Sequence, residues 1–234
     1  MVGLQHSGRE FAAAAYSLAN TEFTEDGYVL KAAGVVIDTV TAAGRPFKRN
    51  GAQHNVAPAL KFFHKWGTIF IGARGKSTAE QGVFCRTISC GKWTSEDETS
   101  YSAKLKDIYG LSRSLLPDFP LDQHHFISPS DIIDAQEEDT KKAQLATALS
   151  ASLTMNKRRL VIGDLKTVGL APWNSAEGDI ICVLFGCRFP VILRRQDESH
   201  FILVGEAYID GYMTGEAMKK LEDGTYRAEI FEIR

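Results

Sequence analysis

The sequence predicts an α+β protein in which a small antiparallel β-barrel or rolled sheet accompanies a helical middle section. Three apolar runs of strand length lie between residues 178 and 217, separated by Gly, Pro or charged turns. Such runs are typical of an antiparallel meander. Upstream, apolar residues recur at helical spacing, and near residue 158 the period changes to alternation. The sheet is therefore expected mainly in residues 158–234, completed by one N-terminal strand.

A single domain is expected for the 234 residues, helix-rich over 41–157 and β-rich over 158–234, because no linker-like stretch marks a boundary. The predicted helices span 8–19, 53–70, 79–90 and 97–111, and one long helix or two shorter ones span 129–155. The predicted strands span 28–38, 159–162, 167–170, 179–185, 190–195, 200–209 and 226–233. Within the first of these strands, Gly34 is expected to mark a β-bulge.

Composition argues against a nucleic-acid or membrane partner. The formal net charge is −2 and the isoelectric point is about 6.3, so no basic excess favours nucleic acid. The sequence has no run of about 18 apolar residues that would predict a membrane span. The short apolar stretch at residues 11–16 lacks the basic flank and the length of a signal peptide. A cytoplasmic protein with reduced thiols is expected.

The four cysteines form two pairs with the same spacing, Cys85 with Cys90 and Cys182 with Cys187. Structural zinc usually takes pairs two to four residues apart on polar or Gly-rich knuckles. Cys85 instead lies on a predicted helix, and Cys182 lies within an apolar strand. Buried thiols are therefore expected, with no metal and no cofactor.

The last third of the chain resembles the C-terminal region of fungal heterokaryon-incompatibility proteins. The matching positions, in order, are Gly178-Asp179, Cys182, Gly186, Leu193-Arg194, Gly205-Glu206-Ala207-Tyr208, Gly211, Met213 and Gly215-Glu216-Ala217. Weaker similarity upstream extends the resemblance over most of the chain. It implies a barrel that recognises a partner or small ligand in fungal nonself recognition.

Two departures limit what the resemblance implies. The proteins of this family usually begin with a domain similar to nucleotide-cleaving TIR domains, and its aromatic-rich motifs are absent from this sequence. NAD cleavage and cell killing are therefore not carried over. In addition, the family often has His where this chain has Asp210, so any role of that His is changed here.

Glu206 is the leading candidate for chemistry. In the strand 200–209 its side chain shares a face with Val204 and Tyr208, and both faces of the strand are apolar. A buried carboxylate must pair with a cation, accept several hydrogen bonds or stay protonated. Two interpretations stay open: a structural ion pair with Arg194 across a hairpin, or a general acid/base inside a barrel.

Further candidates come from the neighbourhood of this strand and from a histidine-containing loop. The acid/base candidates beside Glu206 are Asp210, Tyr208 and His125. The residues expected to bind or to line a pocket are Arg194, Trp173, Trp66 and Tyr212. For His125 a plain surface loop is the competing interpretation.

Two functions are carried forward. The first is a module that binds a small-molecule ligand or a fungal protein partner, as the resemblance implies. The alternative is a cofactor-free enzyme of fungal small-molecule metabolism, an isomerase, dehydratase or cyclase that moves protons in an apolar barrel pocket. A purely structural scaffold is the third interpretation.

Overall fold

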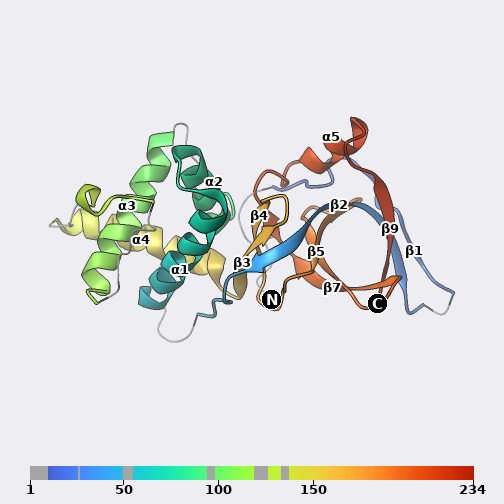
Figure 1. Ribbon diagram of the computed structural model, residues 1–234, viewed down its shortest axis with the longest axis horizontal. Coiled ribbons are helices and arrows are strands. Elements are labelled where there is room, and N and C mark those ends of the chain that lie inside the picture. Colours follow the sequence, from blue (N-terminus) through green and yellow to red (C-terminus); the bar gives the residue numbers. More distant parts are fainter. Residues whose placement is uncertain (1–9, 26, 50–54, 94–97, 119–125, 133–136) are drawn as a thin grey trace. The chain divides into compact units, whose positions relative to one another are not determined.

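The computed structural model describes residues 10–234 except 26, 50–54, 94–97, 119–125 and 133–136. The chain divides into two compact units (Figure 1). Unit 1 consists of Met1–Ala43 and Leu160–Arg234 and holds most of the strands, and unit 2, Gly44–Arg159, holds the long helices. That the two units form one domain stays a prediction.

The α+β class is confirmed, and the strands form one nine-stranded, mainly antiparallel sheet. The strands are β1 (Thr21–Phe23), β2 (Leu30–Ala43), β3 (Arg158–Gly163), β4 (Val168–Pro172), β5 (Ile180–Leu184), β6 (Val191–Arg195), β7 (His200–Glu206), β8 (Tyr208–Ile209) and β9 (Ala228–Ile233). All predicted strands are present, and the predicted strand 200–209 is divided into β7 and β8 at Ala207.

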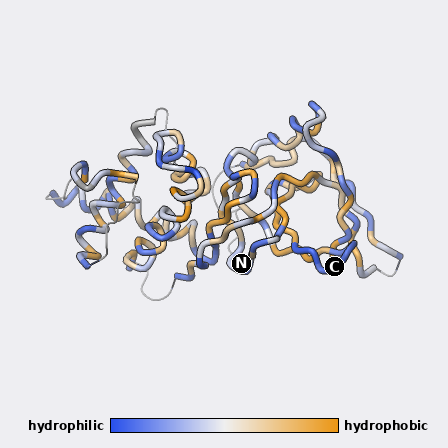
Figure 2. Tube along the Cα trace, viewed as in Figure 1, coloured by the Kyte–Doolittle hydropathy of each residue, from blue (hydrophilic) through white to orange (hydrophobic). Residues whose placement is uncertain are grey.

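Five of these strands pair in a closed circuit: β2 with β5, β5 with β6, β6 with β7, β7 with β9, and β9 with β2 again. Four of the pairings are antiparallel, and the β7–β9 pairing is parallel. Figure 1 shows β2, β5, β7 and β9 arranged around one centre. The strands of the circuit are largely hydrophobic (Figure 2). One apolar cluster joins them: Ala32, Cys182, Leu184, Val191, Leu193, Phe201, Phe231 and Ile233.

The long strand β2 pairs with β5 along one side and with β9 along the other. Gly34 lies where the two pairings overlap, and its lack of a side chain makes the close approach of β5 possible. A Cβ atom at Gly34 would lie 2.5 Å from the Val183 carbonyl oxygen of β5. Only glycine allows so close a backbone approach. The predicted bulge at this residue is wrong, because the register of β2 shifts further along, within 36–38 and within 40–42.

Asp38 fixes the turn between β3 and β4. Its carboxylate accepts hydrogen bonds from the N–H groups of Thr39 at 2.8 Å, Leu165 at 3.1 Å and Thr167 at 3.4 Å. Asp38 is buried, so these backbone donors satisfy a carboxylate that would otherwise be costly to remove from water.

The predicted helix over 8–19 is wrong in its described part, where residues 13–16 form a turn. A helix would use each N–H for the carbonyl four residues earlier. Here the N–H groups of three consecutive alanines, residues 12–14, donate instead to distant carbonyls, which are those of Met213, Arg188 and Cys187. Their small side chains permit this close packing, so tertiary contacts override the helix propensity of alanine.

Unit 2 is built from four helices among the described residues: α1 (Ala57–Arg74), α2 (Thr78–Ser89), α3 (Glu98–Leu115) and α4 (Glu138–Met155). The first three lie close to the predicted ranges. Within the predicted range 129–155, Pro129–Asp131 form only a short 3-10 turn, and α4 begins at Glu138. In the core of this unit the Phe84 ring packs edge-on against the rings of Phe63 and Phe70.

Unit 1 contains one helix that the sequence pattern did not predict, α5 (Glu216–Glu222). Gly215 precedes it in the left-handed region with φ of 97°. The Glu216 carboxylate accepts hydrogen bonds from the N–H and the hydroxyl of Thr214 at 2.8 and 2.6 Å, which orders this helix start. Among the described residues, no helix combines the length and the apolar character needed to cross a membrane.

Candidate functional site

Arg194 pairs with Asp179 and not with Glu206, its partner in one of the two interpretations left open. Its Nε donates to Asp179 Oδ1 at 2.8 Å, and its Nη2 donates to Oδ2 at 2.9 Å. Asp179 is buried and also accepts the N–H of Ala176 at 2.7 Å, so it caps the turn before β5. This two-pronged hydrogen bond to the carboxylate raises the pKa of the Arg194 guanidinium. The β6–β7 register places Glu206 opposite Val191, away from this pair.

Glu206 ends β7 on a strand that is far less buried than its apolar sequence predicted. Its side chain is half-buried. On the same strand Ile202 and Leu203 expose 41% and 49% of their surface. The expectation that the apolar face carrying Glu206 is buried is wrong, because the rest of unit 1 covers this strand only in part.

The structure brings two of the four acid/base candidates together. The Tyr208 hydroxyl donates to Asp210 Oδ1 at 3.3 Å, and the buried Tyr208 ring packs edge-on against Phe11 with 6.1 Å between ring centroids. Glu206 lies on β7, on the other side of Ala207 from this pair. The fourth candidate, at position 125, lies outside the described residues.

The two predicted tryptophans belong to different units. Trp66 of unit 2 is 1% exposed, and its Nε1–H donates to the Arg45 carbonyl at 3.0 Å. Trp173 of unit 1 follows β4 and is 60% exposed. Trp66 is therefore a core residue of unit 2, and Trp173 presents its indole to solvent.

Tyr212, predicted to bind a ligand, forms its contacts with side chains of its own unit, Lys220 and Tyr226. Its hydroxyl shares a hydrogen bond of 2.7 Å with that of Tyr226, and Lys220 Nζ donates to it at 2.7 Å. The same ammonium lies 4.9 Å from the Tyr212 ring centroid and 5.1 Å from that of Tyr226. The cluster ties α5 to the chain that leads into β9.

This cluster predicts a loss of stability in alkaline solution. Burial, and then the hydrogen bond with Tyr212, raise the pKa of Tyr226 from about 10 to about 12. The unfolded chain therefore releases this proton at lower pH than the folded chain, so the stabilisation is complete below pH 10 and is lost as the pH rises towards 12. Urea unfolding at pH 8 to 12 measures it. Tyr226→Phe is expected to be less stable at pH 8 and to decline less between pH 10 and 12, and an unchanged slope would contradict the assignment.

The cysteines are thiols, as expected. Cys85, Cys90 and Cys182 are buried, and Cys187 is partly buried. Burial raises the pKa of the Cys85, Cys182 and Cys187 thiols, which keeps them protonated and unreactive at neutral pH. Within the described parts of the chain, no group of three His, Cys, Asp or Glu side chains could hold a metal ion.

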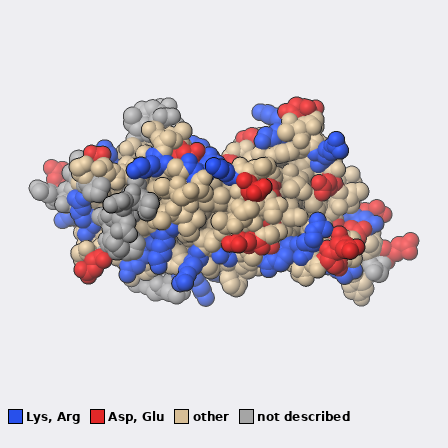
Figure 3. Space-filling view, in the orientation of Figure 1, with Lys and Arg blue, Asp and Glu red and all other residues tan. Residues whose placement is uncertain are grey.

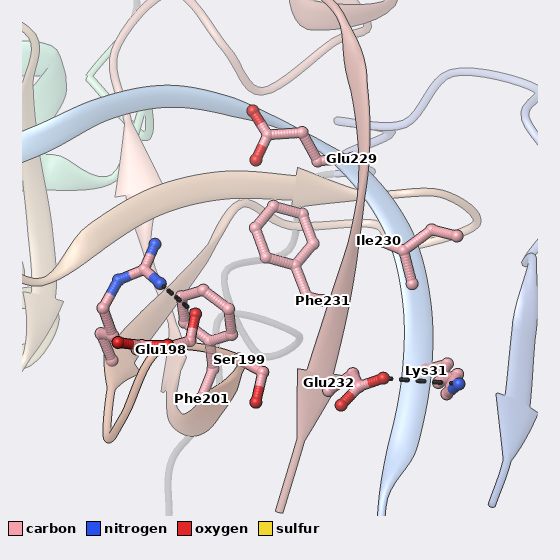
Figure 4. A pocket seen from close by; sticks show the side chains of 9 residues that line it. Lys31, Glu198, Ser199, Phe201, Glu229, Ile230, Phe231 and Glu232 are labelled. Atoms are coloured by element: carbon pink, nitrogen blue, oxygen red, sulfur yellow. Dashed lines mark hydrogen bonds and ion pairs between the residues drawn. The ribbon is translucent and has the colours of Figure 1, made fainter.

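A cleft in unit 1 has no counterpart among the predicted site residues. It has a volume of about 440 Å³ and lies between the β6–β7 turn and β9 (Figure 4). The turn side provides Arg195, Glu198 and Ser199, and the strand side provides Lys31 and residues 229–232. At its base the rings of Phe201 and Phe231 meet edge-on, with 5.5 Å between centroids.

Charges of both signs surround this cleft. Lys31 Nζ pairs with Glu232 Oε1 at 3.4 Å, and the Arg195 guanidinium stacks on the Phe201 ring at 4.8 Å from its centroid. Arg195 also donates to the Glu198 carbonyl at 2.9 Å. On the face that Figure 3 shows, acidic and basic side chains lie close together over unit 1. The cleft therefore suits a polar ligand more than an apolar one.

His200 joins the β6–β7 turn to β9. Its Nδ1 lies 2.9 Å from Asp197 Oδ1, and its Nε2 lies 3.6 Å from Glu232 Oε2. The backbone N–H of His200, and then that of Ser199, hold the pKa of the Asp197 carboxyl well below its usual range. The turn is thus closed by hydrogen bonds to one carboxylate.

The neighbouring Ser199 makes this group look like a hydrolase site, because its Oγ lies 3.1 Å from His200 Nδ1. A serine nucleophile needs a base nitrogen that can accept its proton. Here Nδ1 is also held by Asp197, to which the Ser199 hydroxyl donates at 3.4 Å. A nitrogen that donates to a carboxylate cannot accept a proton. The arrangement locks a turn and does not activate Ser199.

Sequence reasoning missed the cleft because its two walls are far apart in the chain. The turn at 196–199 is polar and indicates only a hairpin. The signal in β9 was its charge: Glu229 and Glu232 in an otherwise apolar strand are typical of a strand edge that proteins leave unpaired. Which strand lies next to that edge depends on the parallel β7–β9 pairing.

Among the comparisons with known proteins, one finds a match, which is to a protein family. No curated protein and no solved structure matches the chain. The family model of the Het-6 beta-barrel domain matches residues 96–227, which is more than half of the sequence. The matched range contains α3 and α4 of unit 2, the strands β3 to β8, and α5. The chain therefore belongs to the Het-6 beta-barrel domain family.

Proposed function

We propose that the protein is a binding module and that its closed circuit of five strands is a small β-barrel. The ring of pairings from β2 through β5, β6, β7 and β9 supports the barrel, as does the name of the family. Barrels of few strands are filled by their own side chains. The apolar cluster around Phe231 fits that expectation, so binding falls to the surface of the barrel and not to an inner cavity.

The cleft beside β9 is the proposed binding site, and its lining is the observation that carries the proposal. Two charged walls flank a base of two phenylalanine rings that meet edge-on, Phe201 and Phe231, which are 6% and 1% exposed. A rigid apolar base with polar groups at the rim is typical of recognition sites. The bound species is a polar small molecule or a protein segment in a fungal recognition context.

A pair of variants tests the site against a matched control. Arg195→Ala with Glu229→Gln removes one charge of each sign from the cleft, and Lys219→Ala with Glu222→Gln makes the same change on exposed positions of α5. Native mass spectrometry and thermal shift are applied after incubation with extract of the producing organism. A species retained by the wild type and the control, but not by the cleft variant, supports the proposal. Equal retention by both variants places binding elsewhere.

The alternative is a cofactor-free isomerase, dehydratase or cyclase. The specific observation in its favour is the Tyr208–Asp210 hydrogen bond of 3.3 Å, which holds a phenol and a carboxylate together. Asp210→Asn keeps an acceptor for Tyr208 and removes the base. Conversion of a retained small molecule by the wild type, lost in this variant while the fold is intact, would favour the enzyme over the binding module.

A further inference from the structure

The backbone of β9 has one edge that the described strands cover only in part. β7 pairs with β9 at two positions, His200 with Glu232 and Phe201 with Ile233. Beyond them the register runs into the β6–β7 turn, since residues 196–199 precede β7. The described sheet places only β7 and β2 next to β9. Residues 228–231 of β9 therefore lack a strand on the β7 side.

The hydrogen-bond pattern identifies the groups on that open edge. The N–H of Arg234 donates to the Phe201 carbonyl at 2.9 Å, so Arg234 directs its backbone groups toward β7. Because the direction alternates at each residue of a strand, Glu232, Ile230 and Ala228 point the same way.

A second set of contacts gives the same assignment from the other edge of β2. Ala33 donates its N–H to Asn20 and accepts the N–H of Phe185, both on the side away from β9. Its neighbour Ala32 consequently faces β9, where it pairs with Phe231. Phe231 is thus bonded to β2, and the adjacent Ile230 faces away from it.

These outward backbone groups border the cleft. Ile230 lines it and is 69% exposed, and Ala228 and Glu229 are exposed as well. In Figure 4, Phe231 and Ile230 leave β9 on opposite sides, Phe231 toward the base beside Phe201. An extended segment along this edge would find backbone partners at Ile230 and Ala228 and an apolar surface at alternate positions.

The charges next to this edge select the partner. The Glu198 and Glu229 carboxylates form no ion pair with another described residue, whereas Lys31 is paired with Glu232. The Arg195 guanidinium already stacks on the Phe201 ring and donates to the Glu198 backbone carbonyl. Unit 1 as a whole carries 10 Lys and Arg against 17 Asp and Glu, a net charge of −7. The carboxylates at the cleft that form no ion pair with a described residue and the net charge of unit 1 are therefore both negative.

We propose that β9 binds a basic, extended segment of a partner protein by strand addition at Ala228 and Ile230. Lysine or arginine side chains of that segment lie by Glu198 and Glu229, and an apolar side chain covers Phe201 and Phe231. Main-chain hydrogen bonds supply the affinity of such additions, and alternate side chains supply their specificity. This inference rests on the proposed function and names the class of its ligand.

Ile230→Pro tests the backbone contact directly. Proline removes the N–H that faces the open edge and leaves the β2 ladder intact, and edge strands tolerate it. The probe is a fluorescein-labelled heptapeptide of alternating lysine and valine, measured by anisotropy on the whole protein. We expect Ile230→Pro to bind about tenfold more weakly than Ile230→Thr, which shortens the side chain and keeps the N–H. Equal binding by the two variants would overturn the proposal.

Two further probes decide the outcome even where Ile230→Pro fails to fold. The same peptide N-methylated at alternate residues on its pairing edge is expected to lose binding to the wild type, and the glutamate–valine peptide is expected not to bind. Equally tight binding of the N-methylated peptide would overturn strand addition. Equally tight binding of the glutamate–valine peptide would overturn the basic partner. A dimer abolished by Ile230→Pro would assign the edge to a second copy of this chain. A small molecule lost in the Arg195/Glu229 cleft variant but kept by Ile230→Pro would overturn this inference and leave the proposed function standing.

Discussion

Replacing Trp66 by alanine is expected to lower the free energy of unfolding by about 3–5 kcal/mol. The indole is 1% exposed, packs edge-on against Phe62, and bonds the Arg45 carbonyl through Nε1–H. Its removal opens a cavity and leaves that carbonyl without its donor. The Gly44 backbone lies directly on the indole, since a Cβ there would be 2.6 Å from it. Urea unfolding followed by far-UV circular dichroism measures the loss.

Trp173→Ala is the matched control for this prediction. Trp173 is 60% exposed, so the same substitution is expected to cost less than about 1 kcal/mol. A large cost at the exposed tryptophan and a small one at the buried tryptophan would contradict the assignment of Trp66 to the core. Trp66→Phe is expected to lie between the two, because it retains a ring and loses the hydrogen bond.

Gly34→Ala is expected to destabilise the protein by about 3 kcal/mol through overpacking at the centre of the strand circuit. The new Cβ would stand 2.5 Å from the Val183 carbonyl oxygen and 2.9 Å from Leu184 Cα. Both obstacles are backbone atoms, which cannot swing aside as a flexible side chain does. Relief requires β2 and β5 to separate, so the change weakens the whole ring of pairings.

The control is the same substitution where space is free. Gly72 lies within α1, and a Cβ there would meet nothing within 4 Å. Because alanine favours a helix over glycine by roughly 1 kcal/mol, Gly72→Ala is expected to stabilise the protein. Opposite signs for the two substitutions, read from their urea midpoints, are the expected result. A stabilising Gly34→Ala would show that β2 and β5 are not held at this distance.

Much of the secondary structure follows from local pattern alone. The alternating and β-branched runs around Val35, Ile192 and Leu203 predict strands, and all three belong to strands. Helical spacing of large apolar residues such as Phe63 and Trp66 likewise predicts α1. These signals are carried within one segment, so they depend little on what the segment contacts.

The failures are places where distant contacts overrode local preference. The alanines at 12–14 have strong helix propensity, yet their N–H groups bond carbonyls of residues 187, 188 and 213. For Arg194, an ion pair with Glu206 on the β7 side was one of two open interpretations, and the guanidinium pairs instead with the buried Asp179 on the β5 side of β6. Burial of β7 was also overestimated, because an apolar strand does not reveal how much of it another element covers.

Local sequence patterns predict the α+β class, most element positions and, through the residues from Gly178 to Ala217, the family. The parallel pairing of β9 with β7, and with it the cleft between residues 195–199 and 229–232, becomes visible only in the folded chain. The reason is physical. Periodicity is a property of one segment, whereas strand order and the free edge of β9 arise from contacts between segments far apart in the chain, which no local spacing encodes.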